Sequence, residues 1–411
     1  MGQYIKVLKQ RNFILVFLGQ AISNLGNGIN TLGLTWFILN ANGNVSDLGL
    51  LMITIFLPNF ILGPIAGTIV DRMNKKHAVV IGDIVSGLLS LLLISATELW
   101  MVYVLVFGLN SVRVFFNPAM RSLLPGILEK EYLLEANALF SISHRISMLL
   151  GPTLGGVLVA LVGVKGVFLL NGVSFVLSAL SEAFICSSTS KKVAKNKQSL
   201  IADINDSMIY IKANKAIKFV IIFFILISIT GGSWSILSKA YLTIEAKVTV
   251  YSFGVYSSLL GVGSLLGALI LGKIGRRVNP IKMMLFAAIF YPLAYGGLGF
   301  SINPVWLGIC FIVAGVTSSL INVSYDIYLQ SNVDKDMLGR VFSLDMAFSG
   351  VIMLVSAQVT TVIGNHILPS VLLITYAGVS ILIGAACTAY YCKHEQLINK
   401  STTKDENKPA A

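Results

Sequence analysis

Four titratable side chains inside or beside long apolar stretches are the groups of this sequence best suited to chemistry. They are the carboxyl groups of Asp83 and Glu182, the guanidinium of Arg113 and the imidazole of His144. Ionisable groups in apolar surroundings are costly and mark substrate or proton paths, and histidine exchanges a proton near neutral pH. We therefore predict that a carboxyl group, Asp83 ahead of Glu182, pairs with Arg113 and carries a proton, with His144 as the alternative carrier. The structural alternatives are a packing ion pair for Arg113 and a hydrogen-bonded packing role for His144.

A stripe of polar side chains follows the first apolar run. Gln20, Asn24, Asn27 and Thr31 are spaced four, three and four residues apart, which places them on one face of a helix. Four amides and hydroxyls in line exceed what packing needs, so we expect them to line a substrate path. Hydrogen bonds between helices, worth about 0.6 kcal/mol each, are the alternative.

A second polar set lies in the fourth apolar run, where Asn110, Arg113 and Asn117 are spaced three and four residues apart. These positions share a helix face, and a buried guanidinium needs a carboxylate, carbonyl groups or water. The set would therefore bind an anionic substrate group or take part in proton coupling. Aromatic side chains that would suit a bulky apolar ligand nearby are Trp36, Phe56, Phe115, Phe116 and Trp234.

A short basic loop ends the second apolar run. Two glycines four residues apart would let another helix approach closely, and one acid and three cations follow them. The residues are Gly63, Gly67, Asp71, Arg72, Lys75 and Lys76. We interpret the loop as a latch, a charged contact that closes the inner face, in which Asp71 meets the positive end of a helix beginning near Met337 to Arg340. The alternative is a topology signal with a surface ion pair worth under about 1 kcal/mol.

The composition is that of a membrane protein. Of the 411 residues, 55% are hydrophobic and 12% are charged, whereas soluble chains carry about 25% charged residues. The net charge of +12 falls in short loops between apolar runs, which indicates orientation in a bilayer and argues against nucleic-acid binding. The four cysteines have no metal-ligand spacing, and the sequence contains no Walker A motif and no nucleophile–base arrangement. We therefore predict no metal, no cofactor and no enzymatic activity.

The apolar runs predict an all-α membrane protein with twelve spanning helices. Their expected ranges are 13–40, 46–70, 77–97, 99–120, 135–162, 166–187, 217–240, 249–272, 279–301, 304–330, 337–364 and 368–392. Both termini are expected inside, because 25 of the 30 lysines and arginines then fall in inner segments and 3 in outer ones, a strong orientation signal.

Internal similarity divides the chain into two pseudo-symmetric halves. The basic loop recurs in weaker form at 264–277, and 124–133 resembles 329–338. Two six-helix repeats are the plan of a secondary transporter. The predicted parts are an N-terminal half (1–186), a cytoplasmic linker with an amphipathic helix from Ser199 (187–216), a C-terminal half (217–392) and a disordered tail (393–411).

These motifs resemble those of the major facilitator superfamily over the whole chain. In that family the loop after the second helix reads Gly-x-x-x-Asp-Arg-x-Gly-Arg-Arg, and here it runs from Gly67 to Lys76 with Asn74 in place of a glycine. Asparagine tolerates left-handed backbone conformations, so the turn is expected to be kept. The family's drug antiporters share a Gly-Pro-x-x-Gly-Gly segment in the fifth helix, to which the resemblance assigns the prevention of leak. We expect its glycines to give close packing between the two halves. Here the segment consists of Gly151, Pro152, Gly155 and Gly156.

The resemblance implies a secondary active transporter with the major facilitator fold. The sequences of residues 117–119 and 339–343 resemble those of one branch of the family. This branch contains the bacterial macrolide efflux pumps and the enterobactin exporter. This predicts a monomer in a bacterial cell membrane that exports bulky apolar or amphiphilic small molecules by proton antiport and alternating access. The alternatives are export of an endogenous metabolite such as a siderophore, and a non-transporting membrane sensor or scaffold of the same fold.

Overall fold

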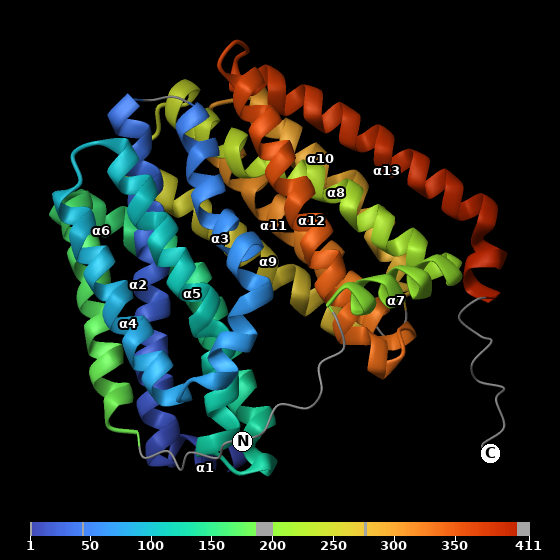
Figure 1. Ribbon diagram of the computed structural model, residues 1–411. Coiled ribbons are helices and arrows are strands. Elements are labelled where there is room, and N and C mark those ends of the chain that lie inside the picture. The colour runs from blue at the N-terminus through green and yellow to red at the C-terminus, as the bar shows by residue number, and fades with distance from the viewer. Residues whose placement is uncertain (1, 43–44, 186–199, 275–277, 401–411) are drawn as a thin grey trace, which may run out of the picture. The chain divides into compact units, whose positions relative to one another are not determined.

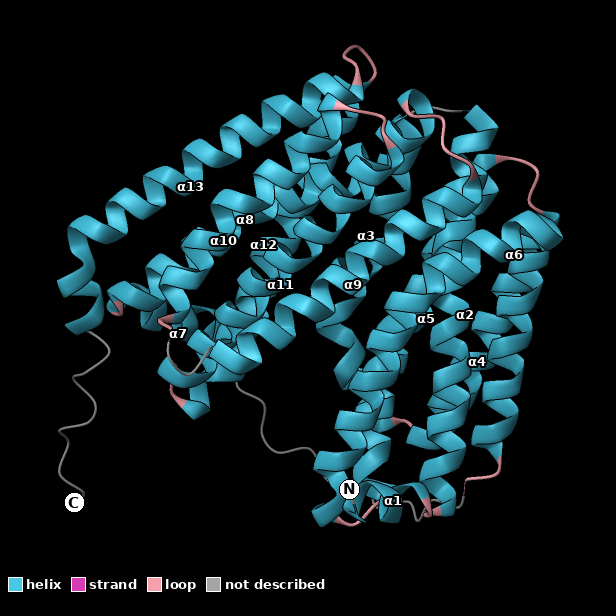
Figure 2. Ribbon diagram, turned by 180° about the vertical axis from the view of Figure 1, so that it is seen from behind, coloured by secondary structure: helices cyan, strands magenta, loops and turns pink. Residues whose placement is uncertain are grey.

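Two compact helical units make up the chain. The computed structural model describes residues 2–42, 45–185, 200–274 and 278–400. Unit 1 comprises Met1–Lys195 and Val248–Ser258, and unit 2 comprises Asn196–Lys247 and Leu259–Ala411. Within the described residues, all regular structure is helical (Figure 2). The prediction of an all-α chain is confirmed.

Unit 1 is a bundle of long helices. Its elements are α1 (Gly2–Leu8), α2 (Arg11–Asn42), α3 (Val45–Arg72), α4 (Lys75–Leu92), α5 (Leu99–Ile127) and α6 (Leu133–Ala183), with short 3₁₀ turns at Leu93–Ser95 and Lys130–Tyr132. The helices α2, α4, α5 and α6 lie side by side (Figure 1). α2 packs along α6, α3 packs along α5, and α4 contacts both α5 and α6. Three helices, α2, α4 and α6, thereby share one interior.

Glycines at seven-residue intervals bring α2 against the second part of α6. A Cβ atom at Gly19, Gly26 or Gly33 would lie under 3.0 Å from a side-chain atom of α6. At Gly19 that atom is Ser178 Oγ, at 2.8 Å. Small residues let membrane helices approach closely in this way. The contact places Gln20, the residue after Gly19, against α6.

The helix α6 contains two of the predicted spans. It is 51 residues long and bends at Gly163, whose φ of 71° suits glycine. Ten helices of the described residues are long and apolar enough to cross a bilayer, with α6 counted once. α2 is not among them, because its polar stripe lowers its mean hydropathy. When both parts of α6 and the 32-residue α2 are counted, the helices match the twelve predicted spans.

Unit 2 is also built of long helices. They are α7 (Leu200–Ala213), α8 (Lys215–Ala240), α9 (Val250–Ile274), α10 (Pro280–Gly297), α11 (Pro304–Asn332), α12 (Lys335–Gly364) and α13 (Pro369–Lys400). A π-helical turn at Tyr241–Glu245 follows α8, and a 3₁₀ turn at Leu298–Phe300 follows α10. α8 packs against α12 and α13, and α10 packs against α11 and α13 (Figure 2). The first turns of α9, up to Ser258, belong to unit 1.

Four helices begin at an asparagine cap. The side-chain oxygens of Asn74, Asn214, Asn279 and Asn303 accept hydrogen bonds from the first backbone N–H groups of α4, α8, α10 and α11, which satisfies donors that have no partner within the helix. Asn74 has φ −68° and ψ 118°, so the left-handed turn expected there is wrong. Asn74 replaces the family's glycine as a helix cap.

The linker helix and the last helix were predicted with different success. α7 begins at Leu200, and its Ile211 side chain is buried, whereas the amphipathic and cytoplasmic character of the linker helix stays a prediction. α13 continues to Lys400 with a bend at His394, so a disordered tail does not begin at residue 393. Residues 187–199 of the predicted linker and 401–411 of the predicted tail lie outside the described residues.

Candidate functional site

A buried pair of carboxyl groups lies between α2, α4 and α6. Asp83 of α4 is 2% exposed, and Glu182 of α6 is 0% exposed. The Gln20 side chain of α2 joins them: its Nε2 donates to Glu182 Oε1 at 2.9 Å and lies 3.5 Å from Asp83 Oδ2. The same nitrogen lies 3.4 Å from Ser178 Oγ. Three helices therefore contribute to one polar cluster.

The cluster has too few hydrogen-bond donors for two ionised carboxylates. The glutamine amide carries two N–H groups and the Ser178 hydroxyl adds one O–H, and no lysine or arginine acts on either acid among the described residues. Glu182 Oε2 is buried and receives no hydrogen bond from a described N–H or hydroxyl group. Asp83 and Glu182 lie within hydrogen-bonding reach of each other. A hydrogen bond between carboxyl groups needs a proton on one of them, because an ionised carboxylate only accepts.

A polar seam along α6 positions the pair. Asn171, Ser178 and Glu182 follow one another at seven and four residues, a helical spacing, and all three are buried. Asn171 Nδ2 donates to Ser90 Oγ of α4 at 3.2 Å, two turns of α4 beyond Asp83. The sequence analysis missed this seam, although the seven-and-four spacing of the polar residues was an available signal.

Arg113 does not pair with the acids in the described structure. Its side chain is exposed on α5, whereas Asp83 and Glu182 point into the interior that α2 covers. Arg113 and Arg145 instead lie close enough to His144 of α6 for their charges to act on it. The predicted carboxylate–Arg113 pair is thus replaced by two groupings, one acidic around Gln20 and one cationic around His144.

The residues of the polar stripe on α2 differ in burial: the first is buried, and the other three are partly or fully exposed. Gln20 is 7% exposed and belongs to the carboxyl cluster, whereas Asn24 and Asn27 are half-buried and Thr31 is exposed. Thr31 Oγ1 donates to the Asn27 carbonyl of its own helix at 2.8 Å. This bond is local, so it gives no support to the alternative in which Thr31 ties two helices together.

The second polar set also keeps its hydrogen bonds local. Asn110 Nδ2 donates to the Val106 carbonyl one turn earlier in α5, at 2.8 Å. Asn117 and Arg113 are exposed on the same helix. These side chains therefore remain able to meet a ligand or water.

The basic loop joins α3 to α4. The Lys75 ammonium donates a hydrogen bond to the Val70 carbonyl in the last turn of α3. A cation at this end of a helix is favourable, because the last carbonyl groups have no partner within the helix. Arg72 is exposed, and Lys76 is half-buried. Lys75 therefore stabilises the end of α3 in addition to its predicted part in the latch.

The remaining latch residues are only partly defined. Gly63 is exposed, and no described atom lies within 4 Å of the place where its Cβ atom would be; the close approach of a second helix at this glycine stays a prediction. The surroundings of Gly67 and the side chain of Asp71 lie outside what the structure describes. Arg340, where Asp71 was expected to dock, forms an ion pair with Asp206 of α7 at 3.6 Å.

The Gly-Pro segment of α6 packs closely on two sides. A Cβ atom at Gly151 would lie 2.7 Å from Gly28 Cα of α2, and one at Gly155 would also meet α2, at 3.0 Å. On the other side, a Cβ atom at Gly156 would lie 2.9 Å from the Val250 carbonyl oxygen, in the part of α9 that belongs to unit 1. These close contacts all lie within unit 1, and the predicted packing of this segment between the two halves stays a prediction.

A serine bridges the backbone of α6 beside Pro152. Proline weakens the hydrogen-bond ladder of a helix, since it has no N–H. The Ser258 hydroxyl donates to the Leu149 carbonyl at 2.9 Å and accepts from the Thr153 N–H at 3.1 Å. The sequence analysis missed Ser258, because nothing in its own apolar run connects it with a helix that lies about a hundred residues earlier.

Several aromatic residues expected near a cavity are packed in the interior instead. Phe115 and Phe116 pack against a core cluster of unit 1. Trp234 is 8% exposed, and its ring lies 5.2 Å from that of Tyr295. Trp234 therefore belongs to the core of unit 2.

Known proteins resemble this chain in sequence and in fold. The family model of the Major Facilitator Superfamily matches residues 16–357. The chain is 24% identical over 339 residues to the Staphyloferrin A transporter of Staphylococcus aureus, covering 80% of this chain and 83% of that protein. It is 23% identical over 356 residues to Macrolide efflux protein A of Streptococcus pyogenes, covering 81% and 84%. A crystal structure of a bacterial homologue of the human lysosomal transporter Spinster matches with a TM-score of 0.70 and 12% identity, covering 98% of this chain and 99% of that one.

Proposed function

Because the chain belongs to the Major Facilitator Superfamily, we propose that it exports bulky apolar or amphiphilic small molecules across a bacterial membrane in exchange for protons. The similarity to Macrolide efflux protein A supports the substrate class. The buried pair of Asp83 and Glu182, joined by Gln20, is the observation that carries the proposal of proton exchange. Transport proceeds by alternating access, in which the substrate leaves the cell and a proton enters it through the same protein.

The pair meets the chemical requirement for a proton site. Two carboxyl groups that share a buried space cannot both ionise without strong repulsion, and charges buried without a partner are costly. One proton therefore stays on the pair while it is enclosed by α2, α4 and α6. Exposure of the pair to water removes this constraint, so that the proton leaves.

A route from proton to substrate runs along α2. Gln20 contacts both acids, and Asn24 and Asn27, one and two turns further along, are half-buried. A change in the hydrogen bonds of Gln20 shifts or rotates α2 and with it the amides of Asn24 and Asn27. Coupling requires such a connection, because each ligand must alter the free energy of binding of the other.

Export of an anionic endogenous metabolite is the second candidate function. Arg113 of α5 and Arg145 of α6 bring two guanidinium groups close to His144, and guanidinium groups bind carboxylates well. The similarity to a Staphyloferrin A transporter favours this alternative. In this case Arg113→Gln and Arg145→Gln would abolish transport of anionic substrates and spare neutral ones.

The test separates proton coupling from substrate movement. Asp83→Asn and Glu182→Gln, each reconstituted in liposomes, should lose substrate movement driven by a pH gradient but keep downhill exchange of substrate for substrate. Asp47→Asn is a matched control, since Asp47 is a half-buried acid of unit 1 that accepts a hydrogen bond from the Tyr103 hydroxyl at 3.1 Å. Full gradient-driven transport by both variants, with loss in His144→Gln, would make histidine the proton carrier. A separate measurement compares the accumulation of a panel of compounds in cells with and without the protein. Equal accumulation of every compound would contradict export and would favour a non-transporting sensor or scaffold.

A further inference from the structure

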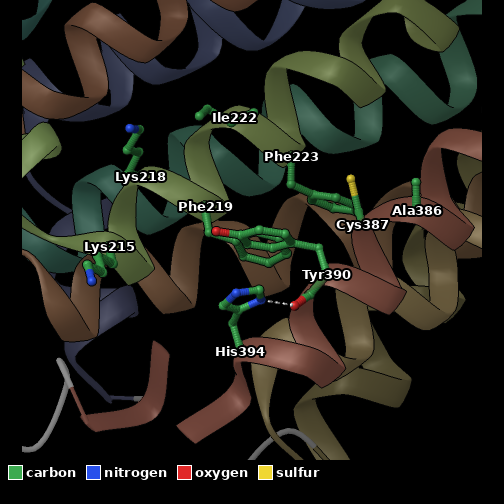
Figure 3. Close-up of a pocket in the computed structure, with 9 residues that line it drawn as sticks. All are labelled: Lys215, Lys218, Phe219, Ile222, Phe223, Ala386, Cys387, Tyr390 and His394. Atoms are coloured by element: carbon green, nitrogen blue, oxygen red, sulfur yellow. Dashed lines mark hydrogen bonds between the residues drawn. The ribbon is translucent and has the colours of Figure 1, made fainter. Parts of the chain in front are cut away.

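We infer that a groove between α8 and α13 binds an anionic phospholipid of the membrane leaflet next to the basic end of unit 2. The groove has a volume of about 660 Å³ and lies between the first turns of α8 and the last turns of α13 (Figure 3). Its two lysines lie on α8, its small side chains lie on α13, and stacked rings lie between them. This site is separate from the carboxyl pair, which belongs to unit 1.

The charge of the groove suits a phosphate group. Lys215 and Lys218 are exposed and lie one turn apart at the start of α8, and no acidic side chain is among the residues that line the groove in the described structure. Cations at the N-terminus of a helix oppose its dipole, so these two lysines do not serve the stability of α8. The side-chain oxygen of Asn214 already occupies the first N–H groups of α8, so the attraction for an anion comes from the two ammonium groups, to which the helix dipole adds.

Stacked aromatic rings place the groove at the depth of lipid headgroups. The Phe219 ring stacks on that of Tyr390 with centroids 5.8 Å apart, and Tyr390 stacks on His394 at 4.5 Å. His394 Nδ1 also forms a hydrogen bond with the Tyr390 carbonyl at 3.1 Å (Figure 3). Tyr390 is 54% exposed, and amphipathic rings of this kind gather at the boundary between membrane and water.

The floor of the groove is apolar and suits an acyl chain. Phe223 lies one turn beyond Phe219 in α8, and Ala386 and Cys387 lie one turn before Tyr390 in α13. The small side chains of Ala386 and Cys387 line the groove together with Phe223 (Figure 3). From the helix ends inward, the lining thus changes from lysine to aromatic to apolar, in the order in which a phospholipid presents phosphate, glycerol and hydrocarbon. Basic pockets between membrane helices bind anionic headgroups in this way.

The test measures lipid that stays with the purified protein. The full chain is incubated in detergent with phosphatidylglycerol or phosphatidylcholine, excess lipid is removed, and the retained lipid is counted by mass spectrometry. Lys215→Gln with Lys218→Gln should weaken retention of phosphatidylglycerol about 25-fold, at roughly fivefold for each lysine near a headgroup. Retention of phosphatidylcholine should stay low and unchanged.

Two further variants make the result specific. Lys6→Gln with Lys9→Gln removes the same charge from exposed lysines of unit 1 and should leave retention as in the original chain. Ala386→Phe fills the groove but keeps both lysines, and it should reduce retention of phosphatidylglycerol as well. The inference is wrong if the Lys215 and Lys218 variant retains as much phosphatidylglycerol as the control, or if phosphatidylcholine is retained equally. Displacement of the lipid by inorganic phosphate alone would also overturn it and would assign the groove to a soluble anion.

Discussion

Replacement of Gly151 by alanine should destabilise unit 1, because it adds a methyl group where α2 and α6 touch through their backbones. The new Cβ atom would lie 2.7 Å from Gly28 Cα and 2.8 Å from Gly28 C. Carbon atoms in contact normally lie about 3.5–4.0 Å apart, so the two helices must separate by about 1 Å. Neither Gly28 atom belongs to a side chain that could rotate away.

The magnitude follows from a comparison with Gly63→Ala. Both substitutions replace a helical glycine and gain the same helix propensity, up to about 1 kcal/mol, but a Cβ atom at Gly63 meets nothing within 4 Å. The difference between the two variants therefore isolates the overpacking at Gly151, which costs about 1–3 kcal/mol. This difference corresponds to a roughly 5- to 150-fold change in the ratio of unfolded to folded protein, since about 1.4 kcal/mol is a factor of ten.

The assay is reversible unfolding in mixed micelles, with transport measured in liposomes at equal amounts of folded protein. Gly155→Ala gives an intermediate point, because its Cβ atom would lie 3.0 Å from the Ile29 carbonyl oxygen and 3.2 Å from Leu32 Cβ. We expect stability to fall in the order Gly63→Ala, Gly155→Ala, Gly151→Ala. Equal stability and equal transport of the Gly63 and Gly151 variants would refute the reasoning. Reduced transport by Gly63→Ala at normal stability would instead support its predicted latch role.

Three further predictions concern orientation, substrate range and the linker helix. Cysteines introduced at Lys75 and Lys247 should react with an impermeant reagent from opposite sides of the membrane, and labelling from the same side would contradict the expected topology. Asn27→Ala should change the relative transport rates of different substrates at an unchanged amount of folded protein, whereas a lower amount with the same profile would indicate packing. Asp206→Asn should change stability by less than about 1 kcal/mol, because the Arg340–Asp206 pair at 3.6 Å is exposed. A larger loss would show that this pair holds α7 against α12.

The helices were predictable from the sequence because apolar surface and bilayer thickness set their length. Their ends were less predictable, because hydropathy shows where apolar surface stops and does not show where backbone hydrogen bonding stops. α13 illustrates the difference: the apolar run ends near residue 392, yet the helix continues to Lys400. At Asn74 the residue type was informative, but a helix cap and a left-handed turn both favour asparagine, and the sequence did not distinguish them.

The acids of the candidate site were predictable, but their partner was not. Asp83 and Glu182 are conspicuous as carboxyl groups beside apolar runs, and an arginine is the strongest partner that a sequence offers. The rotation of α4 and α6 decides which partner they meet. That rotation is set by contacts of small residues, such as Gly19 against Ser178, which have no charge to reveal them. In the sequence, Gln20 could therefore be recognised only as one end of a polar stripe, and its hydrogen bonds to two acids could not be foreseen.

The placement of Gln20 explains how a proton site without a cation can still respond to substrate. An arginine partner would keep a carboxylate ionised, whereas an amide with two N–H groups cannot satisfy two ionised acids, so the protonation of the pair depends on how tightly α2 encloses it. α2 is held by glycine contacts on two faces, with Gly19, Gly26 and Gly33 against the second part of α6 and Gly28 against the first part. Thr31 is exposed, and Asn24 and Asn27 are half-buried. A substrate that binds the amides of Asn24 and Asn27 therefore acts on the same rigid helix that encloses the proton. In this arrangement coupling needs only a small movement of α2, and a variant that loosens the contact at Gly28 should weaken proton coupling more than it weakens substrate binding.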